Sequence, residues 1–352
     1  MEKIKVNVHD QMTPWERKRA YENGRKTDRV IAVPFMSEIK CFLTGTSIYD
    51  WWHDAEVMAD VEIRLFNRFG YDRLTFGPNT RGITEALGGT FVYSENQAPH
   101  MEEIFVKDFS RLNEMDPDNI GSHTRIKVFL EAIEKLVGVA GDIVPIEASI
   151  GGPFTIASNL RGTERLLRDC RKETEQIQKM MRIITDAQKS VIDEIAKYDH
   201  VGIAMADPVA NPMLIGPKMY EEFVFPYTKE ITEYAYEKTG QKVSLHMCGK
   251  TNAIWKYFVQ YPLNEISLDN IVDLEKAAEE LGEHVPIAGN VDPVGSILKG
   301  TKEEIFIDVK NCMDKGSKAE KGFHLTTGCD IPEKASAEKI EWFMEAARKQ
   351  AE

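Results

Sequence analysis

The chain has 352 residues, of which 42% are hydrophobic and 29% charged, a composition typical of a globular protein with a large core. Its formal net charge of -13, without a basic run, argues against nucleic acid as a partner, and no apolar run approaches the ~20 residues that cross a membrane. Five cysteines in a chain of this length do not make a disulfide framework, and the first residues lack the apolar stretch of a secretory signal, so we expect a cytoplasmic protein.

The stretch Thr13-Pro14-Trp15-Glu16 has the pattern of a helix N-terminus. A threonine N-cap, a proline at the first helical position and a glutamate at the third form a capping box, which predicts that a helix begins here. We assign residues 1–28 to an N-terminal helical segment that precedes the first strand.

Eight short apolar runs follow along the chain, each succeeded by a helical pattern. They are rich in Val, Ile and Leu with little polar alternation, which is typical of parallel strands buried on both faces. Strands that alternate with helices in this way predict a (β/α)8 TIM barrel over residues 29–352, a single domain; a doubly wound sheet is the alternative. The expected strands span residues 29–35, 72–78, 142–151, 200–207, 242–249, 264–270, 285–292 and 322–330.

Two longer gaps between these strands leave room for extra helices on the barrel. We expect helical insertions around residues 81–141 and 152–198. The clearest helical stripe in them consists of Ile177, Met181, Ile184, Val191 and Ile195. Its spacing is that of a core-facing helix surface rather than of a cofactor site.

Polar residues gather where the expected strands end, while the strand centres stay apolar. In barrels the loops that follow the strands converge at one face and carry the reacting groups, so this asymmetry predicts a functional site there. The residues concerned are Glu38, Asn79, Asp207, His246, Cys248, Asp269, Asn290, Asp292, Cys329 and Asp330.

His246 and Cys248 form the most informative pair. In a strand, residues i and i+2 point to the same face with Cα atoms ~6.5–7 Å apart, a spacing at which both side chains can reach one zinc ion. Cys329 ends the last expected strand and supplies a third soft donor. Three protein ligands with one open position are typical of catalytic zinc; the alternative is a set of buried residues without a metal.

Carboxylates and amides at the other strand ends have two interpretations. Asp207 and Asp292 are candidates for acid/base catalysis, but both precede proline, and Asx-type turns explain them equally well. Asp269 is a candidate substrate anchor or labile fourth zinc ligand. We expect Glu38 and Asn290 to contribute to substrate binding.

Aromatic side chains lie near the same strand ends. They are Phe35, Trp51, Trp52, Phe76 and Phe154. They either wall an apolar pocket or pack in the core, and the sequence leaves both possibilities open.

Several phrases at the strand ends carry a family resemblance. They are Ile150-Gly-Gly-Pro-Phe-Thr155, Asp207-Pro208, His246-Met-Cys-Gly249, Gly289-Asn-Val-Asp-Pro293 and Gly328-Cys-Asp-Ile-Pro332. With them the chain resembles the uroporphyrinogen decarboxylase superfamily, and specifically its cobalamin-dependent methyltransferase branch, from about residue 12 to the C-terminus. The decarboxylase itself fits poorly, because its arginine-bearing segment near the first strand is replaced here by Val33-Pro-Phe-Met-Ser-Glu-Ile-Lys-Cys41.

The resemblance implies a reaction class and a ligand set. Enzymes of this branch move a methyl group between a corrinoid and a small molecule, and His246, Cys248 and Cys329 match their zinc ligands. The small molecule is then a thiol acceptor such as coenzyme M or, in the alternative direction, a methyl donor such as a methoxylated aromatic compound. A non-catalytic corrinoid-binding barrel is a third reading.

We expect the corrinoid to come from a separate protein that docks transiently over the barrel mouth. The chain lacks an Asp-x-His-x-x-Gly segment of the kind that gives cobalt a lower-face histidine. No remaining stretch is long enough for a corrinoid domain.

Overall fold

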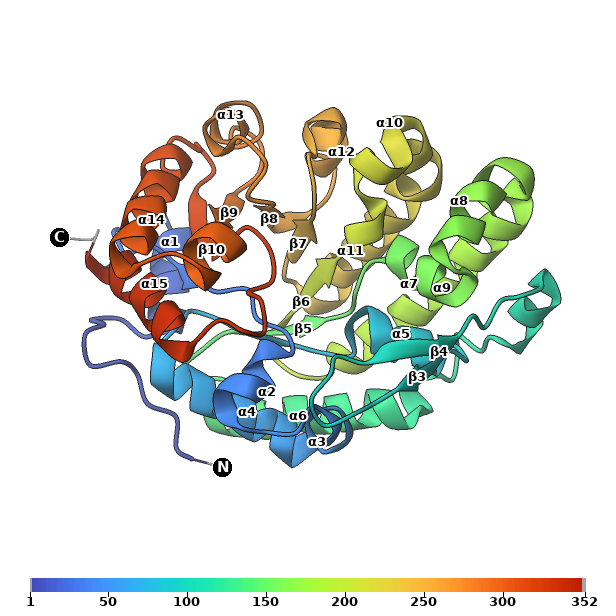
Figure 1. Cartoon of the computed structure of the whole chain (residues 1–352), viewed down its shortest axis with the longest axis horizontal. Helices are drawn as coiled ribbons and strands as arrows, with labels where there is room; N and C mark the ends of the chain where they lie inside the picture. Colours follow the sequence, from blue (N-terminus) through green and yellow to red (C-terminus); the bar gives the residue numbers. More distant parts are fainter. Residues whose placement is uncertain (1, 350–352) are drawn as a thin grey trace.

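Eight parallel strands form one curled sheet in the computed structural model, which describes residues 2–349. The sheet order is β1-β10-β9-β8-β7-β6-β5-β2 (Figure 1). From β2 to β10, each strand of this sheet pairs with the sheet's next strand along the chain, and β10 also pairs with β1. The strands are β1 (Ala32–Val33), β2 (Leu74–Phe76), β5 (Ile146–Ser149), β6 (Val201–Ala206), β7 (Val243–Met247), β8 (Leu263–Leu268), β9 (Ile287–Val291) and β10 (Phe323–Thr327). All eight expected strands are present, and only β8 begins one residue outside its expected range.

The two edge strands of this sheet, β1 and β2, meet through Asp72. The amide of Asp72 donates to the carbonyl of Ala32 at 3.0 Å, and the amide of Ala32 donates to the Asp72 carboxylate at 2.7 Å. These bonds join the two edges of the sheet, β1 and β2, and so close it into a barrel. A doubly wound sheet stays open at its edges. The predicted (β/α)8 TIM barrel is therefore confirmed.

Helices surround the sheet on its outer side (Figure 1). They are α1 (Pro14–Glu22), α2 (Ile39–Thr44), α3 (Ile48–His53), α4 (Ala55–Phe69), α5 (Asn79–Ala86), α6 (Thr124–Ala140), α7 (Pro153–Arg161), α8 (Thr163–Lys172), α9 (Thr174–Ile195), α10 (Pro212–Phe223), α11 (Phe225–Thr239), α12 (Trp255–Phe258), α13 (Leu274–Glu280), α14 (Lys302–Gly316) and α15 (Ala337–Lys349). Shorter helical turns are η1 (Phe109–Glu114), η2 (Ile120–Ser122), η3 (Pro208–Ala210), η4 (Asn252–Ile254) and η5 (Pro293–Leu298). Helix α1 begins with the predicted capping box of Thr13 and Glu16.

The stretch between α5 and α6 departs from the helical expectation. It contains an antiparallel hairpin of β3 (Thr90–Val92) and β4 (His100–Glu103), besides the turns η1 and η2. Both strands are short and largely exposed, so no buried apolar run marks them in the sequence. The stretch after β5 is helical, since it consists of α7, α8 and α9.

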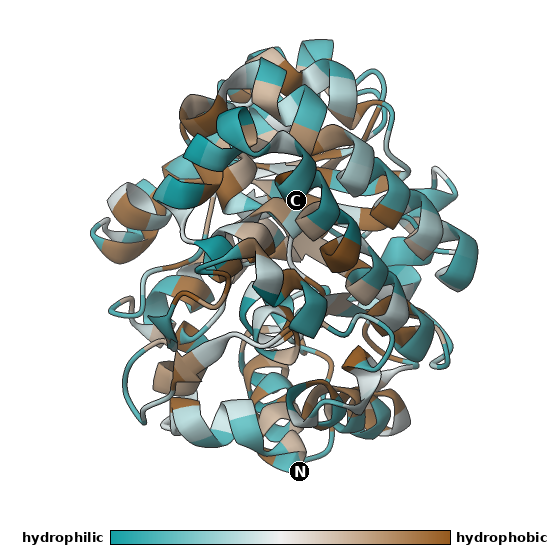
Figure 2. Cartoon of the chain, turned by 90° about the vertical axis from the view of Figure 1, so that its right-hand side faces the viewer, coloured by the Kyte–Doolittle hydropathy of each residue, from teal (hydrophilic) through white to brown (hydrophobic). Residues whose placement is uncertain are grey.

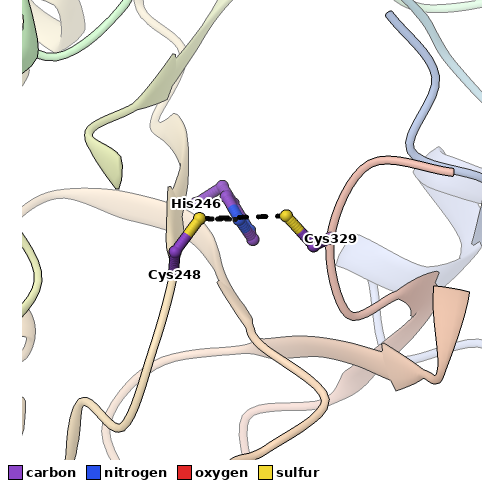
Figure 3. A group of neighbouring side chains, drawn as sticks. All are labelled: His246, Cys248 and Cys329. Carbon is purple, nitrogen blue, oxygen red and sulfur yellow. Dashed lines mark hydrogen bonds between the residues drawn. The ribbon is translucent and has the colours of Figure 1, made fainter. Parts of the chain in front are cut away.

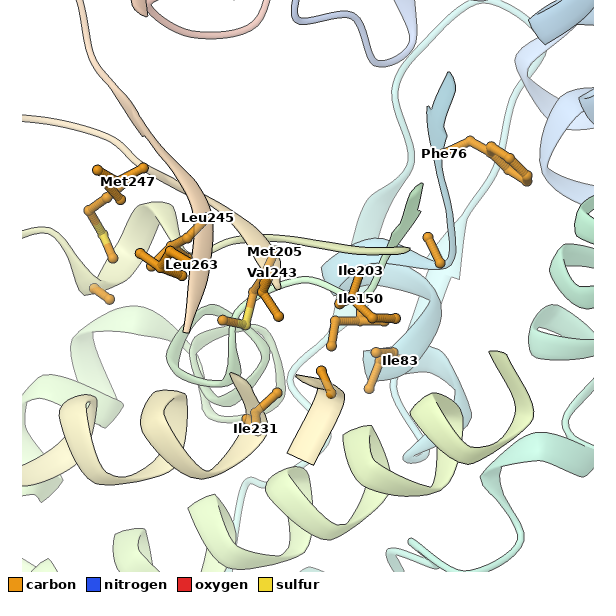
Figure 4. Packing of buried hydrophobic residues seen from close by; sticks show 14 of the residues in the cluster. Phe76, Ile83, Ile150, Ile203, Met205, Ile231, Val243, Leu245, Met247 and Leu263 are labelled. Atoms are coloured by element: carbon orange, nitrogen blue, oxygen red, sulfur yellow. The ribbon is translucent and has the colours of Figure 1, made fainter. Parts of the chain in front are cut away.

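The core lies between the outer face of the sheet and the helices (Figure 4). The apolar stripe predicted on α9 is buried along its whole length. Hydrophilic and hydrophobic residues alternate along the outer helices, as expected where one helix face is buried (Figure 2). Among residues 2–349, no helix combines the length and apolarity needed to span a membrane.

Candidate zinc site and its cavity

Three metal-ligating side chains converge at the ends of two strands that are distant in the sheet. His246 is buried in β7, Cys248 directly follows that strand, and Cys329 lies in the loop after β10. His246 Nε2 is 3.3 Å from Cys248 Sγ, and the two sulfur atoms are 3.8 Å apart (Figure 3). Potential ligand atoms of all three residues lie within 4.8 Å of one another.

This spacing agrees with the geometry of one tetrahedral zinc ion. Two sulfurs bonded to zinc at ~2.3 Å are ~3.8 Å apart, and a nitrogen bonded at ~2.0 Å is ~3.5 Å from each sulfur. The Cys248–Cys329 distance of 3.8 Å and the His246–Cys248 distance of 3.3 Å fall close to both values. The donor set of one imidazole and two thiols also suits zinc and leaves a fourth position open.

The two cysteines interact as a pair even without a metal. The contact with the Cys248 thiol lowers the pKa of the Cys329 thiol, against the effect of burial and with help from neighbouring His246. The same bond and burial raise the pKa of Cys248. In contrast, burial raises the pKa of Cys41 and Cys170 to about 12 each. The contact between the two sulfur atoms therefore sets this pair apart from Cys41 and Cys170.

His246 is held in place by the neighbouring strand and by a ring. Ser267 on β8 is its register partner, and the Ser267 hydroxyl lies 3.0 Å from His246 Nδ1. The ring of Phe35 packs against the imidazole with 4.9 Å between centroids. A hydrogen bond at Nδ1 sets the ring orientation, so Nε2 points toward the two sulfurs.

Both cysteine loops are also anchored. Asp269 accepts a hydrogen bond of 2.7 Å from the amide of Gly249, the residue after Cys248. Gly249 has a φ of 80°, a left-handed conformation that lets the chain turn sharply beyond the ligand. The hydroxyl of Thr327 donates to the carbonyl of Cys329 at 2.8 Å.

A cavity of about 510 Å³ lies beside His246 and extends into the barrel. Three of the five aromatic residues expected near the rim, Phe35, Trp51 and Phe76, line it, whereas Trp52 and Phe154 are buried in the core. The other apolar lining side chains include Met36, Phe91, Met101 and Met205. The hairpin strands β3 and β4 therefore form one wall of the cavity.

The cations that line the cavity form ion pairs. Glu38 accepts a hydrogen bond from Arg81, and both residues line the cavity. Lys40 pairs with Glu62 at 2.6 Å, and both side chains are buried. Asp330 also lines the cavity.

The floor of the cavity is polar. Arg73, which directly precedes β2, contacts Glu265 at 2.7 Å and Glu147 at 3.1 Å. Glu265 also contacts His324. The hydroxyl of Ser244 donates to Glu147 at 2.9 Å. This buried network closes the cavity toward the other end of the barrel.

The structure brings some of the other candidate residues to the site and places others away from it. Glu38 lines the cavity, and Asp269 supports the Cys248 loop. Asn290 does not line the cavity; its amide donates to the carbonyls of Asp269 and Val272 at 3.1 and 2.9 Å. Asn290 therefore steadies the Asp269 loop, and its role in substrate binding stays a prediction.

Both candidate catalytic aspartates cap helices. The buried carboxylate of Asp207 accepts from the amides of Phe154 and Thr155 at the start of α7. Burial raises its pKa to about 6, although these bonds oppose the shift. Asp292 accepts from Val294 and the following amide at the start of η5, outside the cavity. Catalytic roles for both stay predictions, and the contacts favour structural ones.

Sequence reasoning missed Ser267, Glu265 and Arg73. A signal existed for two of them, because Glu265 and Ser267 are two residues apart in β8 and so share one face of the strand. Polar alternation inside an apolar strand marks side chains that face the barrel interior rather than the helices.

Comparison with known proteins shows which proteins this chain is similar to. The methylcobamide:CoM methyltransferase MtbA of Methanosarcina acetivorans is 26% identical over 340 residues, covering 96% of this chain and 98% of that protein. The methylated-thiol–coenzyme M methyltransferase of Methanosarcina mazei is 23% identical, covering 96% and 90%. A uroporphyrinogen decarboxylase of Psychromonas ingrahamii is 22% identical over 73% of each chain.

Among solved structures, a methyltransferase from Methanosarcina mazei superposes with a TM-score of 0.84 at 23% identity, covering 97% of this chain and 99% of that one, and so shares its fold. The family description "Uroporphyrinogen decarboxylase (URO-D)" matches residues 13–350. Because this match spans nearly all of the sequence, the barrel and its strand-end residues included, the chain belongs to the uroporphyrinogen decarboxylase (URO-D) family.

Proposed function

We propose that the chain is a zinc-dependent methyltransferase that moves a methyl group between a corrinoid, carried by a separate protein, and a small thiol. The observation that carries the proposal is the convergence of His246 Nε2, Cys248 Sγ and Cys329 Sγ at zinc-compatible distances beside a cavity. Relatives whose names give methylcobamide, methylated thiols and coenzyme M as their substrates support the reaction class.

The chemistry of the donor set suits a thiol substrate. Zinc bound by these residues would hold a substrate thiol as its thiolate at neutral pH, the form in which sulfur is nucleophilic. In the net reaction the methyl group passes from cobalt to sulfur: the S–C bond forms, the Co–C bond breaks, and its electron pair stays on cobalt. The thiol proton goes to solvent.

The chain's own residues serve this reaction by fixing the ligands. Ser267 orients His246, while Asp269 and Thr327 hold the two cysteine loops. Ligands fixed in this way would hold a zinc ion in one place, so that a substrate thiol bound to it would meet the methyl donor in a defined orientation.

The mouth of the barrel offers a place for the corrinoid protein. Met213, Leu214 and Ile271 are large apolar side chains that are 65%, 47% and 45% exposed. Met213 Sδ accepts from the amide of Lys250, two residues beyond Cys248, and Ile271 follows the anchoring Asp269. We name these three residues the mouth rim and assign it to the transient docking of the corrinoid protein.

Metal analysis tests the proposal most directly. We expect about one zinc per chain in the wild type and loss of zinc in Cys248→Ala and Cys329→Ala, because each variant removes one of three ligands. Cys312→Ala is the control, since this cysteine is buried away from the site. Full zinc retention in both ligand variants would contradict the proposal.

Absorption spectroscopy then tests the reaction. Mixing the zinc-loaded protein with methylcobalamin and a thiol is expected to give the spectral change from Co(III) to Co(I). The same mixture with Cys248→Ala is expected to give none.

A second candidate is demethylation of a methoxylated aromatic compound onto Co(I). The aromatic and methionine walls of the 510 Å³ cavity favour it. Methylation of Co(I) by an aryl methyl ether, with no spectral change on adding any thiol to methylcobalamin, would reverse the order of the two candidates. Decarboxylation of a carboxylate-rich porphyrinogen gains no support, because the cations of the cavity wall already have carboxylate partners.

A further inference from the structure

The cations that line the cavity decide which small molecules it can accept. We infer that the thiol bound beside the zinc ligands is an uncharged one with an apolar, aromatic-sized body, and not an anionic thiol such as coenzyme M. This inference rests on the proposed function, because it names the substrate class of the same site.

Each lining cation in the described part of the chain contacts a carboxylate. The Lys40 ammonium contacts Glu62 at 2.6 Å and donates to the carbonyl of Thr75 at 2.7 Å, and its side chain is 5% exposed. The Arg73 guanidinium contacts Glu265 at 2.7 Å and also Glu147. Neither group can turn toward a new anion without leaving a buried carboxylate unpaired, which is strongly unfavourable.

Arg81 is the most accessible of these cations, with its side chain 28% exposed. It contacts the buried carboxylate of Glu38, and Asp330 lines the same cavity. This corner therefore has two carboxyl groups for one guanidinium. A sulfonate or carboxylate placed there would lose its hydration without gaining an unpaired cation, whereas a neutral group loses little.

The remaining walls suit an apolar body. Phe35, Trp51, Phe76, Phe91 and Met205 line the cavity, and Phe35 packs against His246. A two-carbon thiol would fill only a small part of the 510 Å³ cavity and would leave most of it to water. An aromatic ring would replace that water and contact flat aromatic and flexible methionine surfaces.

Calorimetry on the zinc-loaded full chain tests the inference with two matched pairs of thiols. In the first pair, 2-mercaptoethanol and coenzyme M have similar length and differ in charge. In the second, benzyl mercaptan and 4-(mercaptomethyl)benzoate share an aromatic body and differ in charge. We expect the neutral member of each pair to bind at least about tenfold more tightly, and benzyl mercaptan to bind best of all. Tighter binding of either anionic member would overturn the inference.

A charge variant tests the ion-pair argument itself. Glu38→Gln removes the partner of Arg81 and should raise the affinity for coenzyme M about tenfold, while that for benzyl mercaptan stays within about twofold. Glu275→Gln is the matched control, because it breaks an exposed ion pair with Lys318 outside the cavity. Unchanged coenzyme M affinity in Glu38→Gln would contradict the role given to this pair.

Zinc content and methyl transfer from methylcobalamin, measured on the same samples, separate the two claims. Tight binding of benzyl mercaptan without methyl transfer leaves the inference standing and defeats the proposed reaction. Methyl transfer with a higher kcat/KM for coenzyme M than for benzyl mercaptan supports the reaction and defeats the inference.

Discussion

Ser267 is a single hydroxyl on which the orientation of a metal ligand depends. It sits beside His246 in the sheet and lies 3.0 Å from Nδ1. We expect Ser267→Ala to lower zinc affinity about 10- to 100-fold, because the freed imidazole no longer presents Nε2 to the two sulfurs. Competition with a zinc chelator measures the change.

The conservative variant Ser267→Thr provides the control for this experiment. It retains the hydroxyl on the same strand and should keep zinc affinity near that of the wild type. Equal zinc affinity in Ser267→Ala would show that packing against Phe35 alone holds the ring.

Single residues were predictable from sequence where their chemistry is rare. A histidine and two cysteines at strand ends converge because all strands of a parallel barrel end at one face, and their 3.8 Å sulfur spacing agrees with a shared metal. Asp207 shows the limit of such reasoning. An aspartate before proline at a strand end is equally expected for catalysis and for a cap, and only the contact with Thr155 distinguishes them.

At the scale of elements, ion pairs connect the N-terminal segment to the barrel. The nearly buried carboxylate of Asp28 contacts Arg17 of α1 at 2.7 Å and accepts from the amides of Gln11 and Met12. Burial opposes ionisation of Asp28, but these bonds and the Arg17 charge outweigh it and lower its pKa to about 2. Arg17 in turn contacts Asp72, the residue that closes the sheet.

Replacing Asp28 by asparagine should therefore destabilise the fold in a pH-dependent way. The folded pKa lies below the unfolded value of ~3.9, so the stabilisation is complete above that pH and disappears as pH falls through about 2. We expect the free energy of unfolding to drop by about 2 kcal/mol at pH 7 and by about half as much at pH 3. Urea unfolding at both pH values measures this difference.

An exposed ion pair serves as the comparison for this variant. Glu341→Gln breaks the contact with Arg68, whose side chain is 47% exposed, and should change stability by less than about 0.5 kcal/mol. A similar loss in both variants, or a pH-independent loss in Asp28→Asn, would argue against the assigned role of Asp28.

The hairpin β3–β4 is the element that the sequence did not predict. Its strands are three and four residues long and mostly exposed, so they lack the buried apolar run that revealed the barrel strands. What fixes them is tertiary contact: Phe91 and Met101 line the cavity, and no local pattern encodes that contact.

Two neighbouring residues of β3 test whether the hairpin contributes to binding. Phe91 lines the cavity, whereas the next residue, Val92, is 39% exposed. We expect Phe91→Ala to weaken binding of benzyl mercaptan about tenfold, because it removes aromatic surface from the wall. Val92→Ala should leave affinity unchanged, and zinc content should stay constant in both. Equal calorimetric affinities for the two variants would exclude the hairpin from the site.

At the scale of the whole molecule, the barrel was the most predictable feature. Buried parallel strands have an apolar signature that survives in one sequence, and β5 to β10 lie inside or within one residue of their expected ranges. The contact that closes the barrel between β1 and β2 was not predictable. It depends on a hydrogen bond from the Ala32 amide to the Asp72 side chain, where regular strands would pair through their backbones. The cavity was equally hidden, since its volume follows from side-chain packing across all the strands.

The mouth rim gives a prediction that involves the whole molecule and its partner. Met213, Leu214 and Ile271 are exposed around the loop that carries Cys248, and burying such surface drives protein association. We expect Leu214→Glu to weaken binding of the corrinoid protein that supports turnover by tenfold or more, because a charge would be buried at the interface. Ile307→Glu is the matched control: Ile307 is 60% exposed on the outer helix α14, and binding should be unchanged. Biolayer interferometry, with zinc content and thiol affinity measured alongside, distinguishes loss of docking from loss of the site. If both glutamate variants bound the corrinoid protein as the wild type does, the docking face would have to lie elsewhere on the barrel.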